Sequence, residues 1–537
     1  MGRAGQKFRR HHRLRDCVLM PKPVDARTLK SWLHQKGEIA LLDVREAGQF
    51  GEAHLLYAVP LPYSRLELDV GSLVPRLTTP IVLCDEGDGV AALAGRRLAA
   101  LGYSDLHVLE GGTHGWRAAG FTLFAGVNVP SKVFGELVEH ELHTPRVTAA
   151  ELKAMIDRGD NLVIVDGRPF AEYRKMNIPG GICCPNGELP LRIGAIAPDS
   201  GTRIIVNCAG RTRSIIGAET LRRMGVPNEV FALENGTQGW SLAGLTLERN
   251  AQRKYPPAPQ DSTVARLQAH ASTLAQRAAV PIIDPAQAAQ WLADTSRTTY
   301  LFDVRTAEEF AAGSLRGAVH ATGGQLVQAT DQWVGTRGAR ILLADGEGVR
   351  AVSTAIWLRQ MGHDACVLAQ GVSAGVAAPE PAKPRLPPLP IISPAQLHGA
   401  TVIDLRGSMA YRAAHAEGAI WSIRPRIAKT IGKTIAKIAG GAAHVALIAD
   451  QPMIAGAAAL DLAEAGIGSV SLLEGATPTV STPDDPPDAD CIDFLFFTAG
   501  RHEGDREAAL RYLSWEINLV KELDQPERAS FHILPTR

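Results

Sequence analysis

The sequence lacks a long hydrophobic run, an excess of charge of one sign and any Cys-x-x-Cys pair. The Ala/Ile-rich stretch near 438–449 contains Gly and His, and no run approaches the roughly 18 apolar residues of a membrane helix. Lys and Arg number 56, as do Asp and Glu, so no basic field exists to bind nucleic acid or an anionic membrane. Seven cysteines, an odd number, fit neither a disulfide framework nor a structural zinc site.

These absences favour a protein of the reducing cytoplasm with no nucleic-acid or membrane partner. The first fifteen residues are basic, but no apolar stretch of signal-peptide length follows them, so we interpret residues 1–20 as a basic tail. Hydrophobic residues at 45% and charged residues at 21% are typical of a globular chain. A length of 537 residues predicts three or four domains.

A repeat organises the chain. An apolar run ending in Asp-x-Arg occurs four times, at Asp43–Arg45, Asp166–Arg168, Asp303–Arg305 and Asp404–Arg406. After each comes a second apolar run and an Ala-rich helical stretch that ends at Gly102, Gly225, Gly362 or Gly466. The Asp-to-Gly separation is 59 residues in the first three units and 62 in the fourth. A third apolar run and a Gly turn then complete each unit.

The alternation of short strands and helices predicts an α/β fold, with four tandem domains that each hold a mostly parallel sheet flanked by helices. We place the domains at 21–126, 144–250, 278–378 and 391–482, followed by a C-terminal extension at 483–537. Linkers are expected near 139–144, at 255–259 and at 379–390. The extension should hold an amphipathic helix over 505–523, with Ala509, Leu510, Leu513, Ile517 and Val520 on its apolar face.

The loop after the second apolar run lies at the carboxyl edge of the sheet, where ligands bind in such folds. Its equivalent position holds Asp85, Cys208 and Asp345 in the first three units, and the fourth loop differs in length around Asp450. Cys208 ends a strand and a helix begins within six residues, so converging amides and the helix N-terminus should stabilise its thiolate.

The second unit resembles the rhodanese family of sulfurtransferases, and four tandem copies cover nearly all of the chain. The resemblance rests on Asp166 and Arg168, the Cys-x4-Arg loop from Cys208 to Arg213, and the Glu234–Trp240 turn. It implies that Cys208 takes the outer sulfur of a small anionic donor such as thiosulfate, forms a persulfide and passes the sulfur to cyanide, a thiol or a sulfur-accepting protein. No metal or organic cofactor is implied.

The resemblance also implies roles for the neighbouring residues. Cys208 is the nucleophile, Arg213 orients loop and substrate, and Arg211 recruits the anion at the rim. Asp166 and Arg168 brace the loop. The remaining substrate-binding positions are Ala209, Gly210, Thr212 and Ser214. The first and third copies, with aspartate in place of the nucleophile, and the fourth, which departs furthest, should be inactive.

Several alternatives stay open. The Asp-x-Arg pairs of units one, three and four are interpreted as structural salt bridges. Cys84 should point into its sheet, and Cys183 and Cys184 are either inert packing residues or a resolving thiol. A phosphatase of this fold uses the longer Cys-x5-Arg loop, which disfavours that activity here. A scaffold or sulfur-relay protein with a persulfide-carrying domain is a further alternative.

Overall fold

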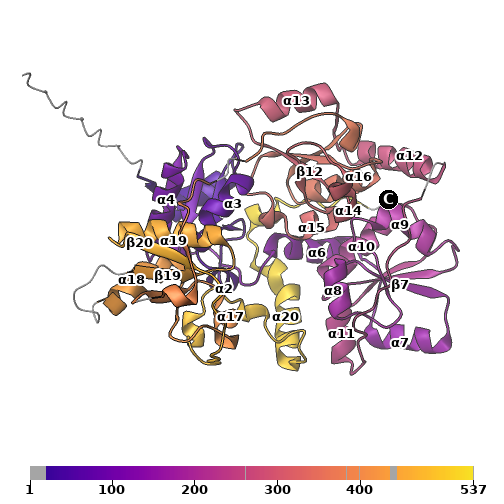
Figure 1. The fold of residues 1–537 in the computed structure, drawn as a ribbon. Coiled ribbons are helices and arrows are strands. Elements are labelled where there is room, and N and C mark those ends of the chain that lie inside the picture. The colour runs from indigo at the N-terminus through magenta and orange to yellow at the C-terminus, as the bar shows by residue number, and fades with distance from the viewer. Residues whose placement is uncertain (1–19, 260–261, 382–383, 398, 436–443, 536–537) are drawn as a thin grey trace, which may run out of the picture.

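The computed structural model describes residues 20–259, 262–381, 384–397, 399–435 and 444–535 (Figure 1). Apart from Met20, the predicted basic tail lies outside the described residues. Four five-stranded sheets form, every pair of neighbouring strands is parallel, and the strand order is the same in all four. The predicted α/β fold of four tandem domains is therefore confirmed. No helix in the described ranges is long and apolar enough to cross a membrane.

The strands of each sheet follow one order. In the first sheet the strands lie in the order β1 (Lys22–Val24), β5 (Leu106–Leu109), β4 (Ile81–Cys84), β2 (Ala40–Asp43), β3 (Val59–Pro60). The second is β6 (Arg146–Val147), β10 (Val230–Leu233), β9 (Arg203–Asn207), β7 (Leu162–Asp166), β8 (Ile182–Cys183). The third is β11 (Ile282–Ile283), β15 (Asp364–Leu368), β14 (Arg340–Ala344), β12 (Thr299–Asp303), β13 (Val319–His320). The fourth is β16 (Ile391–Ile392), β20 (Ser469–Leu473), β19 (His444–Ile448), β17 (Thr401–Asp404), β18 (Ile420–Trp421).

Helices connect these strands. The first domain has α1 (Ala26–Leu33), α2 (Ala47–Glu52), α3 (Leu66–Leu73), α4 (Val90–Ala100) and α5 (Gly112–Ala118). The second has α7 (Ala149–Arg158), α8 (Phe170–Lys175), α9 (Leu189–Ile196), α10 (Thr212–Arg223) and α11 (Gly236–Leu242). The third follows α12 (Ser262–Arg277) and has α13 (Pro285–Ala293), α14 (Ala307–Ala312), α15 (Gly323–Gln328) and α16 (Val349–Gln360). The fourth has α17 (Ser408–Ala413), α18 (Arg424–Ile435) and α19 (Pro452–Glu464).

The sequence repeat corresponds to a repeated piece of structure. Each Asp-x-Arg aspartate is the last residue of its strand, β2, β7, β12 or β17. The four glycines predicted to end helices all have positive φ, which only glycine adopts freely: Gly102 (97°), Gly225 (64°), Gly362 (86°) and Gly466 (85°). Local sequence signals therefore predicted the end of this strand and the end of this helix correctly in all four domains.

The segment near 139–144, predicted as a linker, is largely helical. Residues 139–142 are the last turn of α6 (Val129–Leu142), a helix that packs between the second and third domains. Phe134 of α6 shares one hydrophobic cluster with Ile215 and Ile216 of α10 and Trp357 of α16. The apolar residues of α6 serve the packing of two domains rather than one, so their pattern does not predict a helix of a single repeat unit.

The predicted helix of the C-terminal extension forms as α20 (Arg506–Asn518), capped by the Asp505 carboxylate, which accepts the Ala508 N–H over 3.0 Å. Its buried face agrees with the predicted one at Ala509 and Leu513 but differs from it at other positions. Leu510 and Ile517 are 47% and 45% exposed. The buried positions are Ala508, Ala509, Tyr512, Leu513 and Glu516. Tyr512 and Glu516 of this face make polar contacts with Lys132 and Thr212, which hydrophobic periodicity does not detect.

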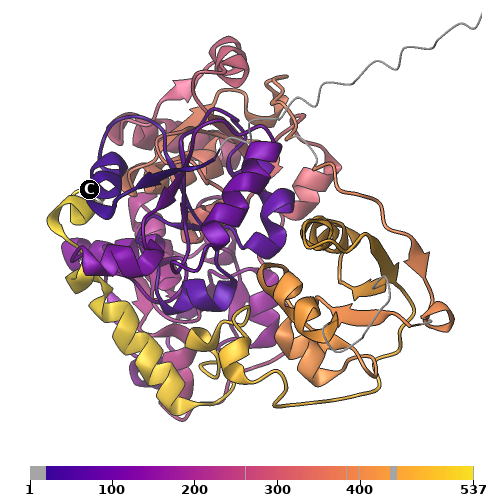
Figure 2. The same ribbon diagram turned by 90° about the vertical axis from the view of Figure 1, so that its left-hand side faces the viewer.

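The extension runs from the fourth domain back across the molecule (Figure 2). It passes α6, where Lys132 donates to the hydroxyl of Tyr512, and reaches α10, where Thr212 Oγ1 donates to Glu516 over 2.8 Å. A Cβ on Gly135 of α6 would lie 2.8 Å from Thr212 Cγ2, so glycine permits the close approach of α6 to the first turn of α10. Three separate segments of the chain thus meet at the start of α10.

Candidate active site

Cys208 follows strand β9 directly, and α10 begins four residues later at Thr212. The cysteine is 2% exposed, and Ser214 Oγ donates a hydrogen bond to its sulfur over 3.1 Å. Within the described part of the chain, the backbone N–H groups of residues 209–213 donate to no other group. These amides and the positive end of α10 are available to a negatively charged sulfur at Cys208.

In the first and third domains an aspartate holds the position of Cys208, and the amides of the loop bind its carboxyl group. The Asp85 carboxylate accepts the N–H groups of Gly87 (2.8 Å), Gly89 (3.0 Å) and Ala91 (3.0 Å). The Asp345 carboxylate accepts those of Gly348 (2.6 Å) and Ala351 (3.0 Å). In both domains a carboxyl side chain of the loop itself fills the ring of amides. The Cys208 loop has a sulfur at this position instead. The N–H of Ser214, the counterpart of Ala91 and Ala351, donates to the carbonyl of Arg211, and the N–H groups of residues 209–213 stay available to the sulfur.

A turn after β10 closes the Cys208 loop from behind. The N–H of Thr237 donates to the carbonyl of Cys208 over 2.9 Å, and that of Gln238 to the carbonyl of Ala209 over 3.1 Å. Thr113 and Val372 donate in the same way to Asp85 and Asp345. The Glu234–Trp240 turn, which contributed to the family resemblance, therefore holds the loop in place.

The Asp-x-Arg pairs form nearly identical salt bridges, each with a buried aspartate. Their N–O distances are 2.7 Å (Arg45–Asp43), 2.7 Å (Arg168–Asp166), 2.6 Å (Arg305–Asp303) and 2.6 Å (Arg406–Asp404). In the second domain alone among these four, the residue before the Cys position also reaches the aspartate, since Asn207 Nδ2 donates to Asp166 Oδ2 over 2.9 Å. This contact ties the Asp166–Arg168 pair to the strand end that bears Cys208, which fits the bracing role predicted for it.

Arg213 forms a bidentate pair with Glu172 of α8, with both N–O distances at 2.8 Å. Burial alone would lower the pKa of the Arg213 guanidinium, but the Glu172 carboxylate outweighs burial and the net shift is upward. Arg350 holds the equivalent position in the third domain and pairs in the same way with Glu309 of α14. The pair recurs in a domain without the cysteine, so it fastens the loop to the neighbouring helix independently of the thiol.

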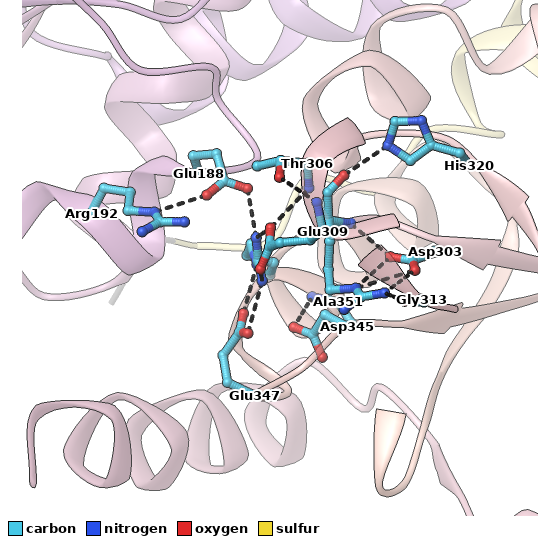
Figure 3. Close-up of polar contacts among 12 residues, drawn as sticks. Glu188, Arg192, Asp303, Thr306, Glu309, Gly313, His320, Asp345, Glu347 and Ala351 are labelled. Atoms are coloured by element: carbon cyan, nitrogen blue, oxygen red, sulfur yellow. Dashed lines mark hydrogen bonds and ion pairs between the residues drawn. The ribbon is translucent and has the colours of Figure 1, made fainter. Parts of the chain in front are cut away.

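The Arg350 pair also joins two domains. Its guanidinium lies among the carboxylates of Glu309, Glu347 and Glu188, the last of which comes from the second domain (Figure 3). Glu188 also accepts from Arg192 over 3.0 Å. Arg350 is 1% exposed, and these carboxylates compensate its buried charge.

Arg211 lies elsewhere than predicted. Instead of standing at a solvent-exposed rim, it is 5% exposed and pairs with Glu136 over 2.7 and 2.8 Å, and with Glu139, both on α6. Burial raises the pKa of Glu136 to about 7 against the opposing effect of Arg211. Sequence reasoning placed Arg211 at the rim because the partner helix lies some 70 residues earlier in the chain, which no local pattern reveals.

A cavity of about 310 Å³ opens beside Cys208 and is lined by the loop residues 209–213. Much of its wall comes from outside the second domain. Asn128 and Lys132 come from the α6 segment, Gln325, Gln328 and Gln332 from the third domain, and Arg501, Tyr512 and Glu516 from the extension. Sequence reasoning missed all eight. One sequence feature could have indicated that the extension contributes to the site. Tyr512 and Glu516 lie four residues apart on the helix, which places a carboxylate on the same face as a buried aromatic ring.

The six described cysteines are all buried and unpaired. Cys84 packs within a hydrophobic cluster of the first domain, as predicted. Cys183 and Cys184 are fully buried and line no part of the Cys208 cavity, and burial raises the pKa of Cys183 to about 12. Their environment fits the interpretation as packing residues. No group of three or more His, Cys, Asp or Glu among the described residues has the arrangement of a metal site.

Comparisons with known proteins agree with this geometry. The family model of the rhodanese-like domain matches residues 25–119, 148–243 and 284–378, slightly more than half of the chain. The chain therefore belongs to the rhodanese-like domain family. It is also similar to the solved thiosulfate sulfurtransferase of Pseudomonas aeruginosa, at 41% identity and a TM-score of 0.86, over 96% of this chain and 99% of that one. The fourth domain lies outside the matched segments but has the same strand order.

Two curated relatives match single segments. The HTH-type transcriptional regulator Rv0324 of Mycobacterium tuberculosis is 32% identical over 106 residues, which is 20% of this chain and 45% of that protein. The putative sulfur carrier protein YrkF of Bacillus subtilis is 27% identical over 103 residues, 19% of this chain and 54% of that one. The chain thus spans about half the length of these curated relatives.

Proposed function

We propose that this protein is a sulfurtransferase that moves a sulfane sulfur from thiosulfate or a related donor to cyanide or a thiol through a persulfide on Cys208. The observation that carries the proposal is the position of Cys208. Cys208 directly follows strand β9. Its sulfur accepts a hydrogen bond from Ser214, and the residue lines a cavity beside a loop whose amides have no other partner among the described residues. The full-length similarity to a thiosulfate sulfurtransferase supports the same assignment.

The reaction has two displacements. The Cys208 thiolate attacks the outer sulfur of thiosulfate, a new S–S bond forms, and sulfite leaves with the electron pair of the broken S–S bond. The terminal sulfur of the persulfide carries the negative charge, which the amides of residues 209–213 and the positive end of α10 stabilise. Cyanide then attacks that sulfur, thiocyanate leaves, and the Cys208 thiolate is restored.

The test is thiocyanate production by the full-length protein with thiosulfate and cyanide, compared with Cys208→Ser. We expect turnover in the wild type, none in the variant, and one added sulfur on the Cys208 peptide by mass spectrometry after thiosulfate alone. An aryl phosphate hydrolysed faster than thiosulfate is consumed would favour the phosphatase alternative and overturn the proposal.

The sulfur-relay alternative differs in its acceptor. Similarity of one segment to a putative sulfur carrier protein is compatible with it. The 2% exposure of Cys208 favours acceptors small enough to enter the cavity over a docked protein. A protein that takes up one sulfur from thiosulfate but releases none to cyanide or to small thiols would be a carrier rather than an enzyme of this kind.

A further inference from the structure

Four cationic side chains line the Cys208 cavity, and three are already neutralised. Arg211 is paired with Glu136 and Glu139, and Arg213 with Glu172. Lys132 lies 3.5 Å from Glu516 and donates to the Tyr512 hydroxyl. The two arginines of the Cys208 loop, which the sequence favoured as anion receptors, therefore have carboxylates in the place of a substrate anion.

The fourth cation is Arg501, in the C-terminal extension. Across the described chain, Arg501 has neither an ion pair nor a hydrogen-bond acceptor, and its Nε is buried without a partner. The guanidinium lies over the ring of Tyr512, 4.0 Å from the centroid, which fixes its plane while its N–H groups stay available. Burial together with the Arg501 charge lowers the pKa of the adjacent His502 to about 4, so that His502 adds no competing charge at neutral pH.

Gln238 is a second unsatisfied group in the same cavity. It is 3% exposed, and neither its Oε1 nor its Nε2 has a hydrogen-bond partner. Its Nε2 lies 3.5 Å from the point where a Cβ on Gly210 would stand, directly beside the sulfur-binding loop. A buried amide without a partner is costly, which indicates that a ligand completes its hydrogen bonds.

Arg501 and Gln238 are neighbours. Both line the Cys208 cavity, and both line a smaller adjoining cavity of about 90 Å³ under the start of α20. The carboxylate of Glu516 also reaches Gly210. Its Oε1 is engaged by Thr212 and Lys132, and its Oε2, 3.2 Å from the point where a Cβ on Gly210 would stand, is buried without a hydrogen-bond partner and can accept from a donor in this cavity. Donor groups with free N–H bonds therefore stand next to the amide ring, in the cavity where the thiol reacts.

We propose that Arg501, assisted by Gln238, binds the oxyanion end of the sulfur donor, so that the C-terminal extension supplies the substrate-binding cation of the Cys208 site. This inference rests on the proposed sulfurtransferase function. A donor such as thiosulfate has its transferable sulfur at one end and a sulfonate at the other. The amide ring receives the sulfur, and Arg501 with Gln238 receives the sulfonate oxygens. Arg501 lies outside every segment matched by the family model, so the domain family does not supply this residue.

The test uses full-length Arg501→Gln and Arg501→Lys, with Arg506→Gln as a matched control. Arg506 belongs to the same extension and lines the smaller adjoining cavity, but it does not line the Cys208 cavity, and its guanidinium donates to the carbonyl of Leu242. In Arg501→Gln we expect KM for thiosulfate to rise ~10- to 100-fold, the effect of losing one charge-assisted hydrogen bond, while kcat and the KM for cyanide stay within about twofold. Arg501→Lys should be intermediate, and Arg506→Gln should match the wild type.

A second readout does not depend on sulfur transfer. Iodoacetate and iodoacetamide have nearly the same size, but only iodoacetate is an anion, so the ratio of their alkylation rates at the Cys208 peptide reports the anion site alone. Arg501→Gln should lower this ratio roughly fivefold, and Arg506→Gln should leave it unchanged. If the wild type makes no thiocyanate but the ratio still falls, the anion site stands and the proposed function fails.

Other results would overturn the inference. One is an Arg501→Gln protein with unchanged KM for thiosulfate and an unchanged alkylation ratio. Another is an Arg501→Gln protein whose kcat and thermal stability both fall while its KM for thiosulfate and its alkylation ratio match those of Arg506→Gln. That result would assign Arg501 a structural role only.

Discussion

The hydroxyl of Ser214 donates a hydrogen bond to the sulfur of Cys208 over 3.1 Å, from the first turn of the helix that follows the loop. The equivalent residues of the first and third domains are Ala91 and Ala351, whose N–H groups donate to an aspartate instead. The serine hydroxyl is therefore a feature of the domain that bears the thiol.

Ser214→Ala should slow sulfur uptake without destabilising the fold, because alanine is the residue at this position in the first and third domains. A hydrogen bond to a charged sulfur contributes about 1.5 to 3 kcal/mol, so kcat/KM for thiosulfate should fall by about tenfold or more. Initial rates of thiocyanate formation give kcat/KM, and an unchanged melting temperature is the control that the fold is intact. An unchanged kcat/KM would mean that the hydroxyl does not stabilise the reacting sulfur.

Arg213→Lys should disrupt the loop, because lysine cannot replace the two parallel hydrogen bonds that Arg213 makes to Glu172. We expect kcat/KM to fall roughly 10- to 100-fold. The matched control is Arg350→Lys in the third domain, which breaks the equivalent pair away from the thiol. It should lower the melting temperature but leave the kcat of the folded enzyme within about twofold. Equal losses of activity in both variants would contradict a local role for Arg213.

Glu136→Gln should change how KM for thiosulfate depends on pH. Glu136 has a pKa of about 7, raised by burial, so in the wild type it becomes neutral as the pH falls through 7. Arg211 then loses one of its two negative partners, the cavity becomes more positive, and KM for an anionic donor falls. In the variant this charge is absent at every pH, so its KM should be lower than that of the wild type at pH 8 and similar at pH 6.

The ratio of wild-type to variant KM isolates this effect, because the titration of the donor and of the other cavity groups affects both proteins alike. The groups facing Glu136 are Arg211 at the N-cap of α10, Glu139 on its own helix and Glu516 on α20. The ratio should be roughly two- to tenfold at pH 8, as for one charge at an effective dielectric constant near 20. A ratio that is constant from pH 6 to 8 would contradict the prediction.

Cys183→Ala/Cys184→Ala should retain turnover within about threefold, because neither thiol lines the cavity and burial raises both pKa values. The measurement is thiocyanate formation together with mass analysis of peptides after thiosulfate treatment. Persulfide on the Cys208 peptide alone is expected. Loss of product release in the double variant, with sulfur still loaded on Cys208, would instead identify a resolving thiol.

Gly135→Ala should push α6 away from the start of α10, because the new Cβ would lie 2.8 Å from Thr212 Cγ2. Overpacking of this kind costs about 1 to 3 kcal/mol and should lower both the melting temperature and kcat/KM. The control is Gly194→Ala on α9, where a Cβ meets nothing within 4 Å. That change should be neutral or slightly stabilising, and equal behaviour of the two variants would show that the contact between α6 and α10 does not matter.

Much of the domain architecture could be predicted because its signals are local. An Asp-x-Arg at a strand end, a glycine at a helix end and a fixed spacing between them identify each unit, and the fourth sheet was recognised although the family model does not match it. The Cys208 loop was predictable for the same reason, since its strand, cysteine, arginine and helix lie within about a dozen consecutive residues. The prediction that Arg211 is exposed was wrong because its carboxylate partners belong to α6, far from the loop in the sequence.

The sequence by itself determined the repeated domains and the identity of the one loop with a thiol, because hydrogen-bonded strands, helix ends and tight turns depend on neighbouring residues. Only the tertiary structure decided what surrounds that thiol. The cavity walls come from α6, the third domain and the extension, and Arg501 stands almost 300 residues from Cys208 in the chain. Which charges meet there depends on how separate domains pack, and packing over such distances leaves no periodic pattern in a single sequence.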